Sequence, residues 1–166
     1  MLKDIGWGFI DKTGKEITQL KYKTVDKFSE GLARVTLNDK FGFIDTTGKE
    51  VIPVIYDVGD SDLDFKSFRE GLARVKLNGK YGFVDKTGKV VIPIKYESAG
   101  SFKEGLVSVK FNGKLGFIDK TGSEIIQFKY DAPDSTSLSF DNGLFGVGGL
   151  FPQFYIDKNG TEYYEP

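Results

Sequence analysis

The sequence contains neither cysteine nor histidine, and its 166 residues include one methionine and one tryptophan. Without cysteine and histidine the chain cannot form a disulfide, a zinc finger, a thiol nucleophile or a catalytic triad that uses imidazole. An excess of one charge is also missing, because 23 Lys and Arg residues face 24 Asp and Glu residues. We therefore do not expect nucleic acid as a partner, since nucleic-acid-binding domains carry a basic surface.

Long hydrophobic runs are absent as well. No apolar stretch approaches the roughly 18 residues that a membrane-spanning helix needs, and residues 1–6 show no basic start followed by an apolar segment, as a secretory signal would. We expect no membrane contact and a cytoplasmic location for the chain as given, or export if it is cut from a longer protein. What the sequence does contain is 21 glycines, 15 phenylalanines and 8 tyrosines, which predicts β-structure with many tight turns.

Two sequence blocks recur along the chain. The block GFIDKTG stands at residues 8–14 and returns with small changes at residues 42–48, 82–88, 116–122 and 154–160. Successive copies are 34, 40, 34 and 38 residues apart. The block FSEGLARV stands at residues 28–35, with further copies at residues 68–75, 102–109 and, degenerate, 140–147. The two longer intervals place their extra residues between 56 and 68 and between 130 and 140, which predicts tolerant surface loops there.

These blocks resemble the WG (KWG) repeat family of bacterial tandem-repeat proteins, which is named for an aromatic–glycine pair. The pair stands here as Trp7-Gly8, Phe41-Gly42, Tyr81-Gly82 and Leu115-Gly116, and it is replaced by Gln153-Phe154 in the last copy. The resemblance covers almost the whole chain. It implies tandem modules that share no catalytic activity.

Each repeat predicts a three-stranded antiparallel meander. Residues 72–77 alternate apolar and polar side chains before Asn78-Gly79, which is the strongest short signal for a hairpin. The returning strand meets residues 85–88, an Asp-first turn that ends in glycine, and a third strand follows. Pro53 and Pro93 lie in third strands and suit a sheet edge, because proline donates no ladder hydrogen bond.

We therefore predict one all-β domain of five meander units, roughly residues 1–22, 23–56, 57–96, 97–130 and 131–166. Three strands end opposite to where the next unit begins, so the connection crosses the sheet or holds a short fourth strand near Tyr56, Tyr96 and Tyr130. A propeller-like ring would remove the open sheet edges, and we favour it. An open superhelical array is the alternative, because stacked repeats need no closure.

Residues repeated in every unit are interpreted as structural. The recurring aromatics are expected to fill the core between units: Phe9, Phe43, Phe83, Phe117 and Tyr155, with Phe28, Phe68, Phe102 and Phe140 as loop anchors. The recurring aspartates are expected to accept hydrogen bonds within their own turns rather than to catalyse: Asp11, Asp45, Asp85, Asp119 and Asp157. The recurring glutamates, Glu30, Glu70 and Glu104, are expected to bond local amides.

Lysines form two rows, one at each end of the strands. One row is Lys40, Lys80 and Lys114, and the other is Lys12, Lys86, Lys120 and Lys158. A row aligned at one rim could draw a phosphate or an acidic partner. Lysine near turns and edges is also an ordinary protection against aggregation, which is the reading we favour.

A metal site has one weak candidate. Asp60, Asp62 and Asp64 imitate the first ligands of a calcium loop. Phe65 stands where such a loop needs glycine, and Gly71 where it needs the bidentate glutamate. We expect a solvated acidic loop without a metal.

Positions that differ between units are the candidates for recognition. They are Trp7 and Tyr81 in the aromatic–glycine pairs, Phe151 in the last insertion, and Tyr163 and Tyr164 near the end of the chain. Exposed aromatics of this kind bind partners, or they cap a terminal unit.

The functional expectation is a non-enzymatic module without catalytic residues or a cofactor. We expect it to bind or scaffold a protein partner through its loops and strand ends. The alternative is a receptor or sequestering protein for a small ligand such as a sugar or a nucleotide. An enzyme would have to be a hydrolase that relies on paired carboxylates, and the sequence marks no such pair.

Overall fold

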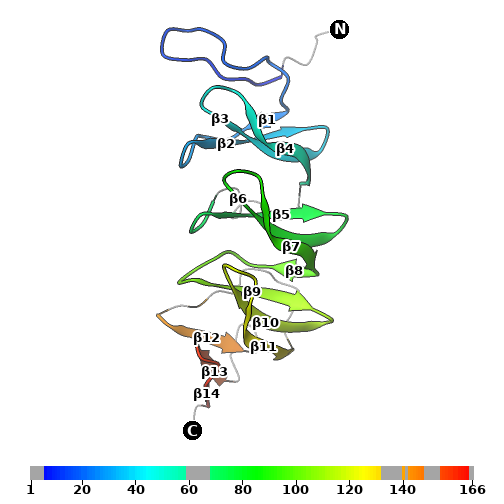
Figure 1. Cartoon of the computed structure of the whole chain (residues 1–166), viewed down its shortest axis with the longest axis vertical. Helices are drawn as coiled ribbons and strands as arrows, with labels where there is room; N and C mark the ends of the chain where they lie inside the picture. Colours follow the sequence, from blue (N-terminus) through cyan, green and yellow to red (C-terminus); the bar gives the residue numbers. More distant parts are fainter. Residues whose placement is uncertain (1–5, 59–67, 132–139, 141, 148–153, 165–166) are drawn as a thin grey trace.

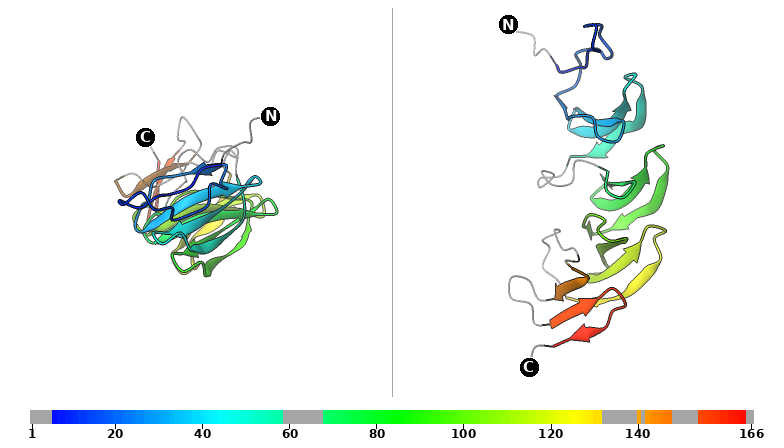
Figure 2. Two further views of the ribbon diagram at one scale, coloured as in Figure 1. Left: turned by 90° about the horizontal axis from the view of Figure 1, so that it is seen from above. Right: turned by 90° about the vertical axis from the view of Figure 1, so that its left-hand side faces the viewer.

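The computed structural model of the chain is an elongated stack of small antiparallel sheets (Figure 1). It describes residues 6–58, 68–131, 140, 142–147 and 154–164. The sheets follow one another along the long axis in chain order, and they overlap when viewed down that axis (Figure 2). These residues include no helix, so no helix among them could cross a membrane. The all-β prediction is therefore confirmed.

Within these described ranges, four sheets hold fourteen strands. The first sheet has the order β1-β2-β3-β4, the second β5-β6-β7, the third β8-β9-β10-β11 and the fourth β12-β13-β14. The first two sheets contain β1 (Thr24–Val25), β2 (Leu32–Leu37), β3 (Lys40–Asp45), β4 (Glu50–Asp57), β5 (Leu72–Leu77), β6 (Lys80–Asp85) and β7 (Val90–Tyr96). The other two contain β8 (Ser98–Ala99), β9 (Leu106–Phe111), β10 (Lys114–Asp119), β11 (Glu124–Tyr130), β12 (Leu144–Val147), β13 (Phe154–Asp157) and β14 (Glu162–Tyr163).

Residues 6–22 precede the first sheet and follow the path of a hairpin. Trp7 pairs with Tyr22 and Ile10 with Glu16 as isolated antiparallel bridges. The Trp7 amide donates to the Tyr22 carbonyl at 2.7 Å, and the Tyr22 amide returns a bond of 3.1 Å. This terminal hairpin covers the first sheet on the side away from the second sheet (Figure 1).

The tight turns form as their residues predict. Asn78 and Gly79 have φ values of 52° and 77°, and they join β5 to β6 with Leu77 opposite Lys80. Left-handed backbone at both turn residues is what a type I′ hairpin needs, and asparagine and glycine tolerate it best. In the second turn, the Gly88 amide donates to the Asp85 carbonyl at 3.0 Å, and Gly88 itself has a φ of 85°.

In each of the first three sheets the last two strands, β3 and β4, β6 and β7, or β10 and β11, pair through a bulge. In the first sheet Phe43 faces Ile52, whereas the next residue, Ile44, faces Glu50, so Val51 is the extra residue. The fourth sheet lacks this shift in its two described pairs, because Tyr155 faces Tyr163 and Ile156 faces Glu162. Tyr163 therefore takes the place in its sheet that Ile52 takes in the first.

The last strand of each sheet, β4, β7, β11 or β14, lies at the edge of that sheet. Pro53 lies in β4 and Pro93 in β7, and both strands are at the edge of their sheets, as the missing proline donor predicts. A short fourth strand also exists after Tyr96, where β8 pairs with β9 of the following sheet. The corresponding parts of the loops after Tyr56 and Tyr130 lie outside the described residues.

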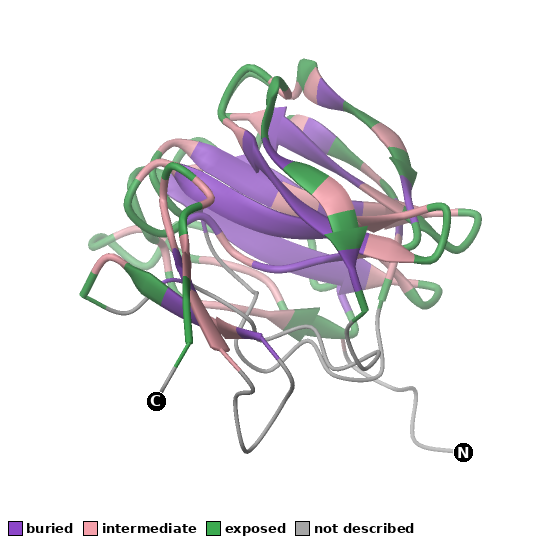
Figure 3. Cartoon of the chain, turned by 90° about the horizontal axis from the view of Figure 1, so that it is seen from below, coloured by how far each residue is buried: buried purple, intermediate pink, exposed green. Residues whose placement is uncertain are grey.

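The hydrophobic core lies between the sheets rather than within a closed barrel. Seen along the stack, the buried residues occupy the middle of the strands and the exposed ones the turns (Figure 3). The recurring aromatics of the inner units are buried, as predicted: Phe43, Phe83, Phe117, Phe68, Phe102 and Phe140. Their counterparts Phe9 and Tyr155 are half-buried, since Phe9 lies on a hairpin rather than a full sheet and no described sheet lies beyond Tyr155.

The structure does not confirm the propeller-like ring. Sheets packed face to face advance along one axis, and the first and last described segments lie at opposite ends of it (Figure 1). Five complete units are not confirmed either, because the described residues form four sheets and one hairpin. Whether the sheets close into a ring depends on the rotation between neighbouring sheets. The recurring turn residues do not specify this rotation, so the sequence could not predict it.

Candidate functional site

Each sheet has two faces, which we name by the neighbour that they meet. The tail face meets the following sheet and the head face meets the preceding one. At the junction of the first two sheets, one cluster combines tail-face and head-face residues. The tail face contributes Leu32, Phe43 and Ile52, and the head face of the next sheet contributes Ala73, Val75 and Val84.

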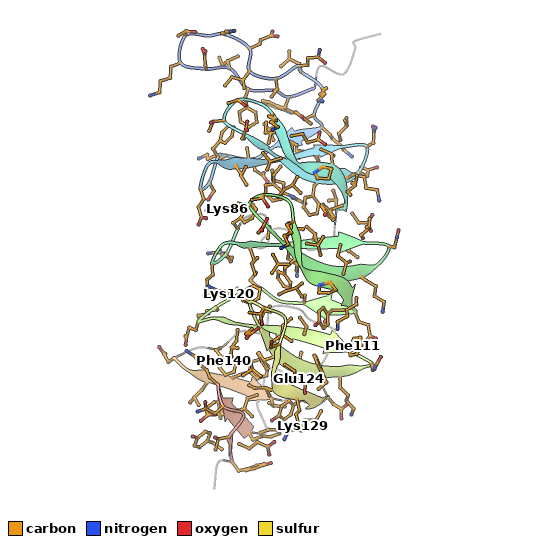
Figure 4. The ribbon with its side chains drawn as sticks, in the orientation of Figure 1. Lys86, Phe111, Lys120, Glu124, Lys129 and Phe140 are labelled. Carbon is orange, nitrogen blue, oxygen red and sulfur yellow. The ribbon has the colours of Figure 1, made fainter. Side chains whose placement is uncertain are left out.

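Ion pairs cross every junction between the sheets on one side of the stack. A lysine in the Asp-first turn of one sheet pairs with a glutamate of the preceding sheet. The pairs are Lys86 with Glu30 at 2.5 Å, Lys120 with Glu70 at 2.9 Å, and Lys158 with Glu104. Lys86 and Lys120 lie one below the other along the same side of the molecule (Figure 4).

The sequence predicted that these glutamates bond local amides, and for Glu70 this prediction is wrong. Glu70 reaches the next unit, where the Gly105 amide donates to its carboxylate at 3.1 Å. Burial, which alone would raise the pKa of Glu70, is outweighed by the hydrogen bonds from Lys120 and Gly105, and that pKa is lowered. These carboxylates hold the register between units.

A second set of ion pairs lies near the hairpin turns. The lysines that begin β3, β6 and β10 pair with acids at the end of β4 or directly after β7 and β11: Lys40 with Asp57, Lys80 with Glu97 at 3.9 Å, and Lys114 with Asp131 at 2.6 Å. Glu97 also accepts the Gly113 amide of the following hairpin at 3.0 Å. Each of these six lysines is thus paired with a carboxylate. At these positions the two lysine rows therefore do not form a surface of unpaired positive charge.

The junction between the terminal hairpin and the first sheet reverses this pattern. Lys23 stands where the later units have an acid, and Asp39 stands where later hairpins have glycine. Their side chains pair at 2.8 Å. The first junction therefore differs chemically from all those that follow.

The recurring aspartates serve their own turns, as predicted. Asp85 Oδ1 accepts the Thr87 amide at 2.8 Å, the Thr87 hydroxyl at 2.6 Å and the Lys89 amide at 3.1 Å. The Thr87 hydrogen bond is the main reason that the pKa of Asp85 is lowered. Equivalent bonds hold Asp11, Asp45, Asp119 and Asp157. Within the described residues no three acidic groups converge on a possible metal.

Trp7 is the most prominent candidate for recognition. Its side chain is 63% exposed, although its backbone is fixed by Tyr22. It lines an open hollow of about 730 Å³ together with Leu20, Lys21 and Tyr22 on the hairpin and with Leu37, Asn38 and Asp39 on the first sheet. Lys21 lies over the Tyr22 ring at 5.0 Å from its centre.

A second aromatic group lies at the other end of the stack. The Tyr164 ring stacks on Phe154 at 5.0 Å, and Tyr164 donates to Glu162 at 2.7 Å. Glu162 also accepts Lys129 at 2.8 Å and the Tyr130 hydroxyl at 3.0 Å. These three donors, Lys129 first, lower the pKa of Glu162 to about 2. Tyr164 is therefore held by its own unit, and Glu162 joins that unit to the sheet before it.

The predicted site residues do not form one site. Trp7 and Tyr164 belong to opposite ends of the long axis, and Tyr163 is half exposed beside Asp157, to which it donates at 3.2 Å. Tyr81 is half-buried in a junction, under Arg74 at 5.1 Å. Phe151 and the three candidate metal ligands Asp60, Asp62 and Asp64 lie outside the described residues.

Two further exposed residues were not singled out in the sequence. Ile10 is 65% exposed and Leu144 is 42% exposed, whereas the same positions in the inner units are buried. Comparing each unit with its neighbours would have pointed to them, because a core position has no cover in a terminal unit.

Comparisons with known proteins agree with the repeats. A comparison with curated proteins finds none that matches the chain. Among solved structures, the crystal structure of the computationally designed Ika4 protein is similar at 15% identity and a TM-score of 0.48, and the match covers 84% of this chain and 88% of that one. The family described as WG containing repeat matches residues 7–41, 41–81, 81–114 and 116–147. These four matches confirm the resemblance carried by the aromatic–glycine pairs, and the chain belongs to the WG-containing repeat family.

Proposed function

We propose that this chain is a non-enzymatic binding module that holds a protein partner in the hollow beside Trp7. The observation that carries the proposal is the exposure of this single tryptophan next to a hollow of about 730 Å³. A large aromatic side chain that remains open in a fixed backbone is the residue type that dominates protein interfaces. Burying it on binding would remove apolar surface from water.

The lining of the hollow favours a peptide segment with an apolar anchor and an acidic neighbour. Trp7 and Leu20 offer exposed apolar surface, and Lys21 offers a cation beside them. Lys23 lies there too, but Asp39 neutralises it. A partner that places an apolar side chain on Trp7 and a carboxylate near Lys21 would match both features.

The remaining units serve as the scaffold in this proposal. We infer that the hairpin of residues 6–22 is a fifth, incomplete unit, because Phe9 packs on the first sheet as Phe43 packs on the second. The recurring carboxylates are engaged in turns and in junctions, which supports a binding role rather than hydrolysis.

The test compares Trp7→Ala with Val90→Ala, which removes another exposed apolar side chain on the second sheet, a sheet that contributes no residue to the lining of the hollow. Proteins retained by immobilised wild-type chain are identified and purified, and their dissociation constants are measured for all three chains. We expect the Trp7 variant to lose about tenfold or more in affinity, as a central aromatic anchor does. Equal binding of every retained protein by wild type and the Trp7 variant would contradict the proposal.

A small-ligand receptor is the second candidate, because the hollow has the volume of sites that hold drug-sized ligands. A thermal shift screen with sugars and nucleotides separates the two. A ligand that stabilises the wild type but not the Trp7 variant would favour this alternative. A screen in which no compound raises the melting temperature leaves the protein-binding proposal in place.

A further inference from the structure

Among the described residues, no sheet covers the tail face of the last sheet. Leu144 and Tyr163 are 42% and 49% exposed, and Tyr155 between them is half-buried. The three positions lie on neighbouring strands, because Leu144 is opposite Asp157 and Tyr163 is opposite Tyr155. In the inner sheets the equivalent positions are buried: Leu32, Leu72 and Leu106; Phe43, Phe83 and Phe117; and Ile52, Ile92 and Ile126.

The inner junctions show what covers such a face. At the inner junctions, the glycine of the Asp-first turn lies against the last strand of the preceding sheet. A Cβ built on Gly88 would meet the Val51 carbonyl at 2.8 Å, and one on Gly122 would meet the Ile92 side chain at 3.6 Å. The residue before the aspartate also faces the preceding unit, and Val84 is fully buried there with Phe43.

The first unit exposes this covering surface. Ile10, the counterpart of Val84, is 65% exposed, and a Cβ on Gly14 would meet nothing within 4 Å. The tail end of one molecule thus presents the face that is covered at the inner junctions, and the head end presents part of the cover, because the described hairpin holds the counterpart of Val84 but not those of Ala73 and Val75.

We propose that the chain associates head to tail with a second copy of itself. The tail face of one copy, formed by Leu144, Tyr155 and Tyr163, covers Ile10 and the turn at residues 11–14 of the next copy. The contact continues the repeat of the inner junctions across the gap between two molecules. Because the two surfaces differ, the contact does not stop at a dimer, and because the sheets advance along one axis, added copies extend the stack into a linear series.

One position sets this contact apart from the inner junctions. The turn lysine of the entering copy, Lys12, meets Asn142, which replaces Glu30, Glu70 and Glu104 of the inner units. Asn142 keeps their left-handed backbone, with a φ of 49°, but it carries no charge. The contact between copies therefore lacks an ion pair that every inner junction between sheets has, and it is weaker.

This self-association is independent of the partner site beside Trp7. Trp7 and Phe9 are turned toward the first sheet, where Trp7 lines a hollow with Leu37 and Phe9 packs on the core. Ile10 directly follows Phe9 and points to the opposite face, as successive residues of an extended strand do. Trp7→Ala therefore leaves the association unchanged and serves as a control.

The experiment uses end-blocked variants of the full chain in sedimentation velocity, over about 10 µM to about 1 mM, where weak protein contacts are populated. Ile10→Asp blocks the head and Leu144→Asp blocks the tail. Both side chains are exposed in one copy, so each variant keeps the wild-type circular dichroism spectrum. Asn142→Glu restores the missing carboxylate.

We expect the wild type to form a series of oligomers that grows with concentration, and Asn142→Glu to tighten the association by about two- to fivefold, the effect of an exposed ion pair. Each blocked variant alone stays monomeric. Their equimolar mixture forms dimers and nothing larger, because one good tail meets one good head. A monomeric wild type, a monomeric mixture, or an Ile10→Asp variant that associates like the wild type would each overturn the proposal.

Discussion

Replacing Phe117 by alanine tests whether the junctions between sheets hold the molecule together. Phe117 is fully buried, and its ring centre lies 4.8 Å from those of Phe140 and Phe145 of the next unit. Removing a phenylalanine from such a site costs about 3–5 kcal/mol of unfolding free energy, since the cavity adds to the lost transfer energy. This is a large part of the roughly 5–15 kcal/mol that stabilises a whole domain.

Tyr155 is the matched control because it occupies the same position in the last unit. In the part of the chain that the structure describes, no sheet lies beyond it, and it is half-buried. Tyr155→Ala is therefore expected to cost about 1 kcal/mol, in proportion to the smaller apolar area that it removes from water. Both variants are measured where the chain is monomeric.

Urea unfolding followed by two probes distinguishes a local from a global effect. Circular dichroism reports on all strands, whereas fluorescence of the single tryptophan, Trp7, reports on the first unit. A repeat array is stabilised by its nearest-neighbour contacts, so loss of one junction uncouples the sheet beyond it. For Phe117→Ala we expect an early circular dichroism transition that the fluorescence does not follow. If Tyr155→Ala costs as much as Phe117→Ala, the reasoning is refuted.

Two other matched substitutions test the turns and the charged groups. Gly14 and Gly48 both have left-handed backbone, so alanine at Gly14 should destabilise the protein by about 1 kcal/mol. Gly48→Ala should cost about 2 kcal/mol or more, because its added Cβ would also meet the Ile17 carbonyl at 2.5 Å. Equal losses in urea unfolding would show that the close approach does not matter. The lowered pKa of Glu162 means that its contribution is complete above its unfolded value near 4.5 and disappears as the pH falls through about 2. We therefore expect wild type to exceed Glu162→Gln in stability above pH 5 and the two to converge near pH 2; a difference that persists in acid would contradict this origin.

The parts of the fold that could be predicted are the turns and strands, because short local motifs that recur in every unit specify them. Asn78-Gly79 and the Asp85 turn specify their own backbone through left-handed residues and side-chain hydrogen bonds, so the sequence predicts the strands between them. The recurrence of Phe43 and Phe83 on one face identifies them as core. These inferences need no knowledge of distant residues.

What could not be predicted depends on the relation between units. The pairing of Lys86 with Glu30 joins two sheets across an insertion of variable length, and neither residue differs from an ordinary surface charge in the sequence. Whether the units close into a ring depends on small rotations that accumulate over the stack. The exposure of Ile10 follows from its place at the end of the array, because an identical residue type is buried at position 44.

The location of the core between neighbouring sheets has a mechanical consequence. Every described contact that joins two sheets involves neighbours in the stack, so tension applied to the two chain ends loads the junctions in series (Figure 1). We expect the sheets to come away one after another under force, each releasing a similar length of chain. Under force, such a molecule would unfold in steps of one sheet each, at nearly equal forces, and it would refold one unit at a time when the force is released.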